Sequence, residues 1–327
     1  MTHPLLSIRD LRVEFETDAG PVPAVRGVDL ELEEGETVAL VGESGCGKSV
    51  TALSIMRLMS GRVAGGQIDF RGQNLASLSE PAMRRVRGAQ IGMIFQEPMT
   101  SLNPVFKIGR QIEEVLTLHQ GLSPSAARGQ AVELLGRVGI PSPAARLEQY
   151  PHELSGGMKQ RVMIAIAIAC RPALLIADEP TTALDVTIQA QIMVLLRSLQ
   201  RELGMAVLLI THDLGLVAHF AERVNVMYAG KIVEHGGVRE IFKQPAHPYT
   251  RALLAALPDP TKRARLEAIG GRVPSPAMLP RGCAFCTRCK HAFEPCPDQQ
   301  PPLFDVGAPH VAACWLHDPG RAAVLES

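Results

Sequence analysis

Residues 37–49 have the sequence TVALVGESGCGKS, in which a short apolar segment runs directly into a glycine-rich loop. The apolar part, Thr37 to Val41, predicts a buried strand of a parallel sheet. The loop, Gly42 to Ser49, matches the pattern G-x-x-x-x-G-K-[ST], and residues 50–59 predict a helix. A glycine turn can match this pattern by chance, but the order of strand, loop and helix is the context in which the pattern binds phosphate. We therefore predict a phosphate-binding loop.

The residue types in this loop fit the binding of a nucleoside triphosphate. The glycines let backbone N–H groups surround phosphate oxygens, and the helix that starts near Lys48 points its positive end at the same anion. Lys48 is expected to reach the β- and γ-phosphates, and the Ser49 hydroxyl is expected to hold Mg²⁺. Cys46 is interpreted as a small space-filling residue rather than a nucleophile. The predicted nucleotide-binding residues are Gly42, Glu43, Ser44, Gly45, Cys46, Gly47, Lys48, Ser49 and Val50.

A second group of polar residues follows another predicted strand. Leu174 to Ala177 are apolar, and Asp178 and Glu179 come directly after them. Val207 to Ile210 form a similar segment, followed by Thr211-His212-Asp213. Such strands in alternation with helices predict an α/β fold that binds its ligands at the carboxyl ends of the strands. Asp178 is placed there to bind Mg²⁺ and Glu179 to polarise an attacking water, although an acidic strand end can also be a solvated cap.

A further helix start lies between these motifs. The sequence LSGGMKQR, residues 154–161, leads into Met158 to Cys170, which is apolar nearly all round and predicts a buried helix. Ser155 and two glycines at its start leave N–H groups and the positive helix end open to an anion. The alternative is a helix cap with no ligand. With the phosphate loop, the chain thus has a second candidate phosphate site at Ser155, Gly156 and Gly157.

Together with Pro180-Thr181-Thr182-Ala183-Leu184-Asp185, these motifs resemble the nucleotide-binding subunits of ATP-binding-cassette (ABC) transporters. The resemblance implies an α/β P-loop ATPase domain with a parallel core sheet, an antiparallel β subdomain and a helical subdomain at about residues 97–170. It also implies that two such domains pair head to tail, with each ATP between the loop of one chain and the LSGG segment of the other. Asp185 would communicate across this dimer.

The resemblance implies roles for further single residues. Glu179, His212, Gln96 and Lys48 would be the catalytic residues, with His212 in contact with the γ-phosphate. Gln96 would sense Mg²⁺ near the contact with the membrane subunits, so that Ser49, Gln96 and Asp178 form the expected Mg²⁺ site. Phe15 would stack on adenine. It lies at the end of the predicted strand Leu6 to Glu16, and we expect a long loop from there to Val25, before a strand at Val28 to Leu32.

The C-terminal part of the chain has a different composition. From Leu257 it is rich in proline, glycine, cysteine and charge, so we place a domain boundary near residue 260, between an ATPase domain at 1–260 and a small domain at 261–327. Five of the seven cysteines lie in this part, and in a reducing compartment such a cluster indicates a metal or iron–sulfur site rather than disulfides. Their spacing leaves zinc and iron–sulfur equally open, with thiols that bind no metal as a third possibility. The cysteines are Cys283, Cys286, Cys289, Cys296 and Cys314.

This tail resembles that of the ATPases of dipeptide/oligopeptide importers, as do residues 247–254, HPYTRALL, and residues 101–104, SLNP. The resemblance implies a [4Fe–4S] cluster with a structural role, bound by Cys283, Cys289, Cys296 and Cys314, and Cys286 departs from the usual pattern. It also implies two membrane permease subunits, a second and different ATPase subunit, and an extracytoplasmic peptide-binding protein as partners. Related importers also carry nickel or other small solutes, so an importer of such a solute is an alternative.

Charge and hydropathy limit the remaining function classes. The chain has 33 basic and 33 acidic residues, so its net charge does not favour general nucleic-acid binding. Its longest apolar run, Val162 to Cys170, is nine residues, whereas a membrane-spanning helix needs roughly 20. The N-terminus lacks the pattern of a signal peptide. We expect a cytosolic protein bound through its partners to the inner membrane; the alternative is a soluble ABC ATPase acting on ribosomes or nucleic acid.

Overall fold

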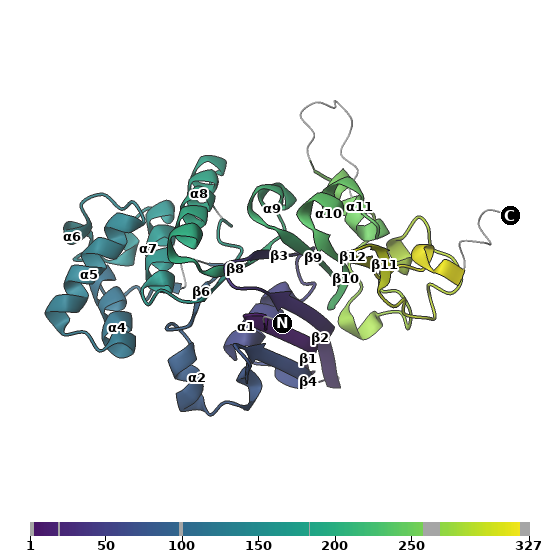
Figure 1. Ribbon diagram of the computed structural model, residues 1–327, viewed down its shortest axis with the longest axis horizontal. Coiled ribbons are helices and arrows are strands. Elements are labelled where there is room, and N and C mark those ends of the chain that lie inside the picture. Colours follow the sequence, from purple (N-terminus) through teal and green to yellow (C-terminus); the bar gives the residue numbers. More distant parts are fainter. Residues whose placement is uncertain (1–2, 19, 98–100, 183, 258–268, 321–327) are drawn as a thin grey trace. The chain divides into compact units, whose positions relative to one another are not determined.

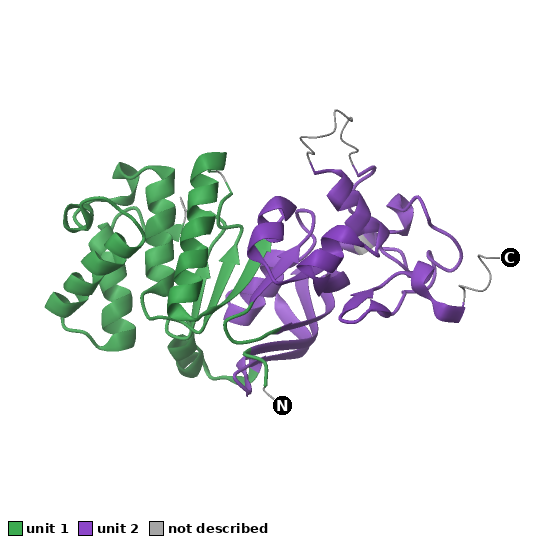
Figure 2. Cartoon of the chain, turned by 45° about the horizontal axis from the view of Figure 1, so that its top comes forward, with its two compact units in different colours: residues 1–5, 32–36, 77–210 green, residues 6–31, 37–76, 211–327 purple. Residues whose placement is uncertain are grey.

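The structure is a computed structural model that describes residues 3–18, 20–97, 101–182, 184–257 and 269–320 (Figure 1). The chain divides into two units, and each unit collects separate stretches of sequence (Figure 2). Unit 1 spans residues 1–5, 32–36 and 77–210, and unit 2 spans residues 6–31, 37–76 and 211–327. The predicted boundary near residue 260 lies outside the described residues.

Unit 1 contains three parallel strands. β7 (Leu174–Asp178) is the middle one and pairs with β6 (Ile91–Ile94) and with β8 (Ala206–Thr211). All three strands are buried along their whole length, which explains why the sequence shows continuous apolar runs here rather than alternation. The parallel arrangement places the residues that follow β6 and β7 at the same edge of the sheet.

The helices of unit 1 include a group of four that lie together in Figure 1, α4, α5, α6 and α7. α7 is buried nearly all round, as its sequence predicts, and it packs against α4, α5 and strand β6. Residues 108–146 form three of these helices, α4, α5 and α6, and Gly121 caps the end of α4 in a left-handed conformation. Among the described residues, the helices with assigned bounds in this unit are α2 (Glu80–Val86), α4 (Ile108–Gln120), α5 (Pro124–Arg137), α6 (Pro143–Arg146), η2 (Pro151–Glu153), α7 (Gly156–Ile168) and α8 (Val186–Leu203).

Unit 2 contains an antiparallel sheet in the order β2-β1-β4-β5. Its strands are β1 (Leu6–Thr17), β2 (Gly20–Leu32), β4 (Arg62–Phe70) and β5 (Gln73–Asn74). The expectation of a long loop up to Val25 is wrong, because β2 already begins at Gly20. β2 contains Pro21 and Pro23, and it is an edge strand, where proline is tolerated because its missing N–H can face away from the neighbouring strand.

A second set of strands in unit 2 carries the phosphate loop and the C-terminal segment. β3 (Thr37–Val41) pairs in parallel with β9 (Arg223–Tyr228), which forms a hairpin with β10 (Lys231–Gly237). β10 then pairs with β12 (His310–Ala312), and β12 with β11 (Phe304–Gly307). The strands after the cysteine-rich segment therefore join the strand set that carries the loop. The helices of unit 2 are α1 (Lys48–Met56), η1 (Leu75–Ser77), α9 (Leu214–Phe220), α10 (Val238–Lys243), α11 (Pro248–Ala255), η3 (Pro276–Met278), η4 (Cys286–Arg288) and η5 (Trp315–His317).

Three aromatic side chains in unit 2 pack the C-terminal segment onto this core. The rings of Tyr228 and Tyr249 have centroids 4.6 Å apart, and Phe285 lies 5.3 Å from the first and 5.4 Å from the second. All three are buried in one apolar cluster with residues of β3 and α9. Aromatic packing of this kind stabilises the contact beyond the area that it buries. Among the residues that the structure describes, no helix combines the length and the apolar character needed to cross a bilayer.

Candidate functional site

The phosphate loop of unit 2 has the predicted context, between β3 and α1. The backbone at Gly42 has a φ of 155°, and a methyl group added there would overlap the carbonyl oxygen of Met227. The loop therefore needs glycine at this position. α1 begins at Lys48 directly after Gly47, so the N–H groups of its first turn lie at the end of the loop. Such a helix start is a ready site for an anion.

Lys48 lies over this loop with its side chain buried. Its Nζ atom donates hydrogen bonds to the carbonyl oxygens of Gly42 at 2.8 Å and Glu43 at 3.1 Å. These contacts hold an ammonium group at the loop. Cys46 is also buried, and burial raises the pKa of its thiol. A neutral thiol is a poor nucleophile, which agrees with the space-filling role inferred for Cys46.

The acidic strand end is in unit 1. Asp178 is the last residue of β7 and is 4% exposed. Glu179 follows it with a φ of 47°, a left-handed backbone that is uncommon for a residue other than glycine. Its N–H donates to the carbonyl of Ile210 at 2.8 Å, which holds this strained turn in place. Strain of this kind is concentrated at functional sites.

The structure brings Gln96 and Glu179 together. Gln96 follows β6 and Glu179 follows β7, so the two residues lie at the same edge of the sheet. The Nε2 atom of Gln96 donates to Oε2 of Glu179 at 3.2 Å, and Oγ1 of Thr182 donates to the same oxygen at 2.8 Å. These two side-chain donors orient the Glu179 carboxylate, and the sequence motifs indicate a role at this site for Gln96 but not for Thr182.

Two of the predicted site residues, Ser155 and Asp185, lie at helix starts of unit 1. Ser155 caps α7, and its side chain accepts a hydrogen bond from the Met158 N–H at 3.4 Å. Asp185 caps α8 in the same way, accepting from the Ile188 N–H at 2.9 Å. A methyl group added at Gly157 would stand 3.0 Å from the side chain of Ile188. The LSGG segment and the start of α8 are therefore close neighbours, and Ser155 and Gly156 are exposed at the start of α7.

The remaining predicted residues lie in unit 2. His212 directly follows β8 and is exposed. Phe15 is near the end of β1 and is half-buried, with its ring beside Gly61. The predicted residues thus divide between the units. Unit 2 holds Phe15, His212 and the loop residues 42–50, and unit 1 holds Gln96, Ser155, Gly156, Gly157, Asp178, Glu179 and Asp185.

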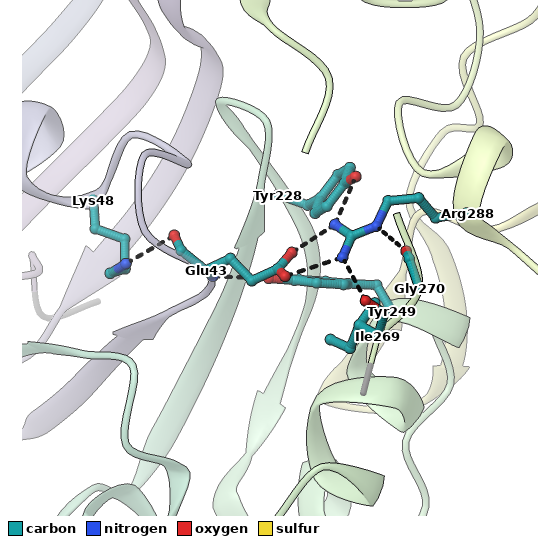
Figure 3. Close-up of polar contacts among 7 residues, drawn as sticks. All are labelled: Glu43, Lys48, Tyr228, Tyr249, Ile269, Gly270 and Arg288. Carbon is teal, nitrogen blue, oxygen red and sulfur yellow. Dashed lines mark hydrogen bonds and ion pairs between the residues drawn. The ribbon is translucent and has the colours of Figure 1, made fainter. Parts of the chain in front are cut away.

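Glu43, the second residue of the loop, has partners that the sequence analysis missed (Figure 3). Its carboxylate forms an ion pair with Arg288, and its N–H donates to the Tyr249 hydroxyl at 2.9 Å. The hydrogen bond to Glu43 is the main cause that raises the pKa of Arg288, and burial raises that of Tyr249. Tyr249 lies in the segment HPYTRALL, and Arg288 lies among the cysteines of the tail, and both segments resemble those of the importer ATPases. That position is the only signal in the sequence that could have drawn attention to them.

The cysteines after residue 280 share one small pocket of unit 2. Burial is the main cause that raises the pKa of Cys283 to about 12 and that of Cys314 to about 11. Among the described residues, no three His, Cys, Asp or Glu side chains form a group that could hold a single metal ion. The pocket is lined by Cys283, Cys286, Cys289, Cys296 and Cys314 together with His247, Pro248, Phe285, His291, Phe293, Pro301 and Trp315.

Comparison with protein families gives two matches along the chain. Residues 25–182 match the model of the family described as ABC transporter. Residues 233–296 match the model described as oligopeptide/dipeptide transporter, C-terminal region. The first match includes the phosphate loop, the LSGG segment and the acidic strand end. The second includes Tyr249, Arg288 and four of the five clustered cysteines.

The chain is similar to curated proteins over nearly its whole length. It is 56% identical over 326 residues to a protein of Brucella melitensis biotype 1 named as a peptide import ATP-binding protein, covering 95% of this chain and 96% of that one. It is 53% identical over 325 residues to the oligopeptide transport ATP-binding protein OppD of Bacillus subtilis, covering 98% of this chain and 91% of that one.

Among solved structures, the fold is similar to that of ATP-binding cassettes. The dimeric post-hydrolysis state of the cassette MJ0796, bound to ADP and Pi, superposes with a TM-score of 0.65 at 29% identity. The match covers 72% of this chain and 99% of that one. The mixed α/β sheets described above are therefore those of a known ATPase fold.

Proposed function

The chain belongs to the ATP-binding proteins of ABC transporters, and from its C-terminal region and its relatives we propose that it hydrolyses ATP to drive uptake of dipeptides or oligopeptides. One observation carries this proposal. The same chain holds three ABC ATPase motifs, residues 42–49, 154–161 and 178–185, and the C-terminal region of oligopeptide/dipeptide transporters.

ATP binding and hydrolysis are assigned to the residues of the loop and of the acidic strand end. Lys48 would neutralise the β- and γ-phosphates, and the N–H groups of the loop and of the first turn of α1 would surround them. Bound Mg²⁺, with Ser49, Asp178 and Gln96 as its proposed ligand set, would offset the phosphate charge.

Glu179 and His212 are assigned the catalytic steps. Its carboxylate would accept a proton from the attacking water, and the hydrogen bonds from Gln96 and Thr182 support this role because they fix its direction. His212 would contact the γ-phosphate.

A second copy of the fold is proposed to complete each ATP site. The exposed start of α7 at Ser155 and Gly156 supports this, because its N–H groups and helix dipole are open to an anion. Gly157 would belong to the same anion-binding site. Asp185 would report the state of one site to the other, and Phe15 would contribute to the adenine pocket. The importer resemblance favours a second, different ATPase subunit as the partner.

The cysteine pocket is proposed to bind a [4Fe–4S] cluster through Cys283, Cys289, Cys296 and Cys314. Five cysteines that line one pocket support a thiolate-bound group. In such a cluster each of the four cysteines binds a different iron. When bound, the cluster would cross-link the C-terminal segment.

The cluster proposal is tested by metal analysis of the full chain purified without oxygen. Iron and sulfide in equal amounts are expected, and stoichiometric zinc would contradict the proposal. Cys283→Ser should lose the iron. Cys286→Ser is the matched control, because Cys286 lies in the same pocket but outside the proposed ligand set. If Cys286→Ser loses the iron while Cys283→Ser retains it, the ligand set is wrong.

The proposed partners are two membrane permease subunits, a second ATPase subunit and an extracytoplasmic peptide-binding protein. They place the chain at the cytoplasmic face of the inner membrane. Purification of a tagged chain from detergent-solubilised membranes tests this assembly. Integral membrane subunits should co-purify, and peptide with its binding protein should stimulate ATP hydrolysis of the complex in vesicles. Co-sedimentation with ribosomes and no membrane subunit would contradict the proposal.

A further inference from the structure

Glu43 is fixed by contacts on both its side chain and its backbone. The two carboxylate oxygens accept from the Nη1 and Nη2 atoms of Arg288 at 2.7 and 3.0 Å. The backbone N–H donates to Tyr249, and the backbone carbonyl accepts from Lys48 (Figure 3). The residue that helps to place the Lys48 ammonium is thus itself held by two residues of the C-terminal part of unit 2.

Arg288 cannot turn away from Glu43 without losing other contacts. Its side chain is 3% exposed, its Nε atom donates to the Gly270 carbonyl at 2.8 Å, and Nη1 also donates to the Tyr228 hydroxyl at 3.2 Å. The guanidinium carbon is 5.8 Å from the ring centroids of Tyr228 and Phe285. Several hydrogen bonds fix the planar guanidinium, which binds the carboxylate through two nitrogens. A lysine ammonium cannot form this two-point contact.

The ion pair also changes the charge at the loop. A lone carboxylate at the second position of a phosphate loop would repel a triphosphate. Arg288 offsets that charge and fixes the carboxylate in one direction. Arg288 is also the last residue of the short helix η4 (Cys286–Arg288), directly before Cys289. Its position therefore depends on the local fold of the cysteine-bearing segment.

We propose that Arg288 is a positioning residue for ATP binding and acts through Glu43. The affinity for nucleotide then depends on the local fold of the cysteine-bearing segment. This inference rests on the proposed ATPase function and deepens it. Arg288 does not touch the nucleotide in this account. It sets the shape and charge of the loop that does.

The test is titration of the full chain with a fluorescent ATP analogue and Mg²⁺. Arg288→Gln should raise the dissociation constant about tenfold, since it removes a charge-assisted pair and leaves Glu43 uncompensated. Arg288→Lys should give an intermediate value, because it keeps the charge but not the two-point contact. Arg281→Gln is the matched control. Arg281 is an exposed residue of the same segment, and its substitution should leave the dissociation constant unchanged.

A double variant separates positioning from a general effect on folding. If Arg288 acts through Glu43, then Glu43→Gln combined with Arg288→Gln should bind the analogue more tightly than Arg288→Gln alone. Equal weakness of the double and single variants would overturn the proposal, as would wild-type affinity of Arg288→Gln. A wild-type chain that does not bind the analogue at all would contradict the proposed function instead.

Discussion

The side-chain amide of Gln96 donates a hydrogen bond to the Glu179 carboxylate at 3.2 Å, and so joins the residues that follow β6 and β7. The pair lies at one edge of a parallel sheet, where such folds bind their ligands. Thr182 adds a second donor at 2.8 Å. A general base must be oriented toward the proton that it accepts, as well as have a suitable pKa. The two donors that orient the Glu179 carboxylate are therefore expected to contribute to catalysis.

Thr182→Val should lower the rate of ATP hydrolysis about tenfold, because it removes the shorter of the two hydrogen bonds that orient Glu179. The affinity for ATP should stay unchanged, since Thr182 is assigned no contact with the nucleotide. Steady-state hydrolysis and nucleotide titration measure the two effects separately. Thr182→Ser keeps the hydroxyl and should retain turnover. A Thr182→Val variant with the wild-type rate would show that this hydrogen bond has no catalytic role.

Gly42→Ala should weaken nucleotide binding at least about tenfold, or by ~1.4 kcal/mol, because the new methyl group meets the Met227 carbonyl and the loop must shift. Gly129→Ala is the comparison variant. Gly129 lies exposed inside α5, with no atom close to an added methyl group. Gly129→Ala should therefore raise the free energy of unfolding by about 0.5–1 kcal/mol and leave the affinity for nucleotide unchanged. Tight binding by Gly42→Ala would contradict the described loop geometry.

His247 should make the stability of the chain sensitive to acid. It is 1% exposed, and burial, with smaller effects of His317 and Arg251, lowers its pKa to about 3. Its Nδ1 atom accepts from the Tyr249 N–H at 3.0 Å, which requires that atom to be unprotonated. The unfolded chain takes up the proton near pH 6.5. The folded state is therefore penalised as the pH falls below that value.

Between pH 7 and pH 5 this residue should lower the free energy of unfolding by about 2 kcal/mol. His247→Asn removes the titrating group and keeps an acceptor at the start of α11, where asparagine is a favourable cap. Urea unfolding of both proteins at the two pH values measures the difference. The prediction fails if the wild type and His247→Asn lose the same stability on acidification.

Local patterns in the sequence predicted much of the fold. Buried strands such as Thr37–Val41 and Leu174–Asp178 are nearly continuous apolar runs, and α7 is apolar on all sides. These elements could be predicted because each is determined by its own residues. The start of β2 could not, because Pro21 and Pro23 favour a loop unless the strand lies at a sheet edge, and the edge is a property of the whole sheet.

The candidate site divides in the same way. The phosphate loop and the residues after β7 follow short patterns whose chemistry is local. Arg288 and Glu43 are 245 positions apart in the sequence, and no sequence motif contains both of them. Nor does the sequence indicate that Thr182 turns its hydroxyl to Glu179, because that contact depends on the strained turn at Glu179. Contacts made by tertiary packing are thus where the structure adds most.

The rate of ATP hydrolysis by the Glu179→Gln variant tests the central claim most directly. It should bind Mg²⁺ and ATP with nearly wild-type affinity while its turnover falls at least about 100-fold, because the amide cannot accept the proton of the attacking water. Lys48→Ala should instead lose nucleotide binding, which distinguishes a damaged loop from a missing base. Hydrolysis by Glu179→Gln at the wild-type rate would contradict the account.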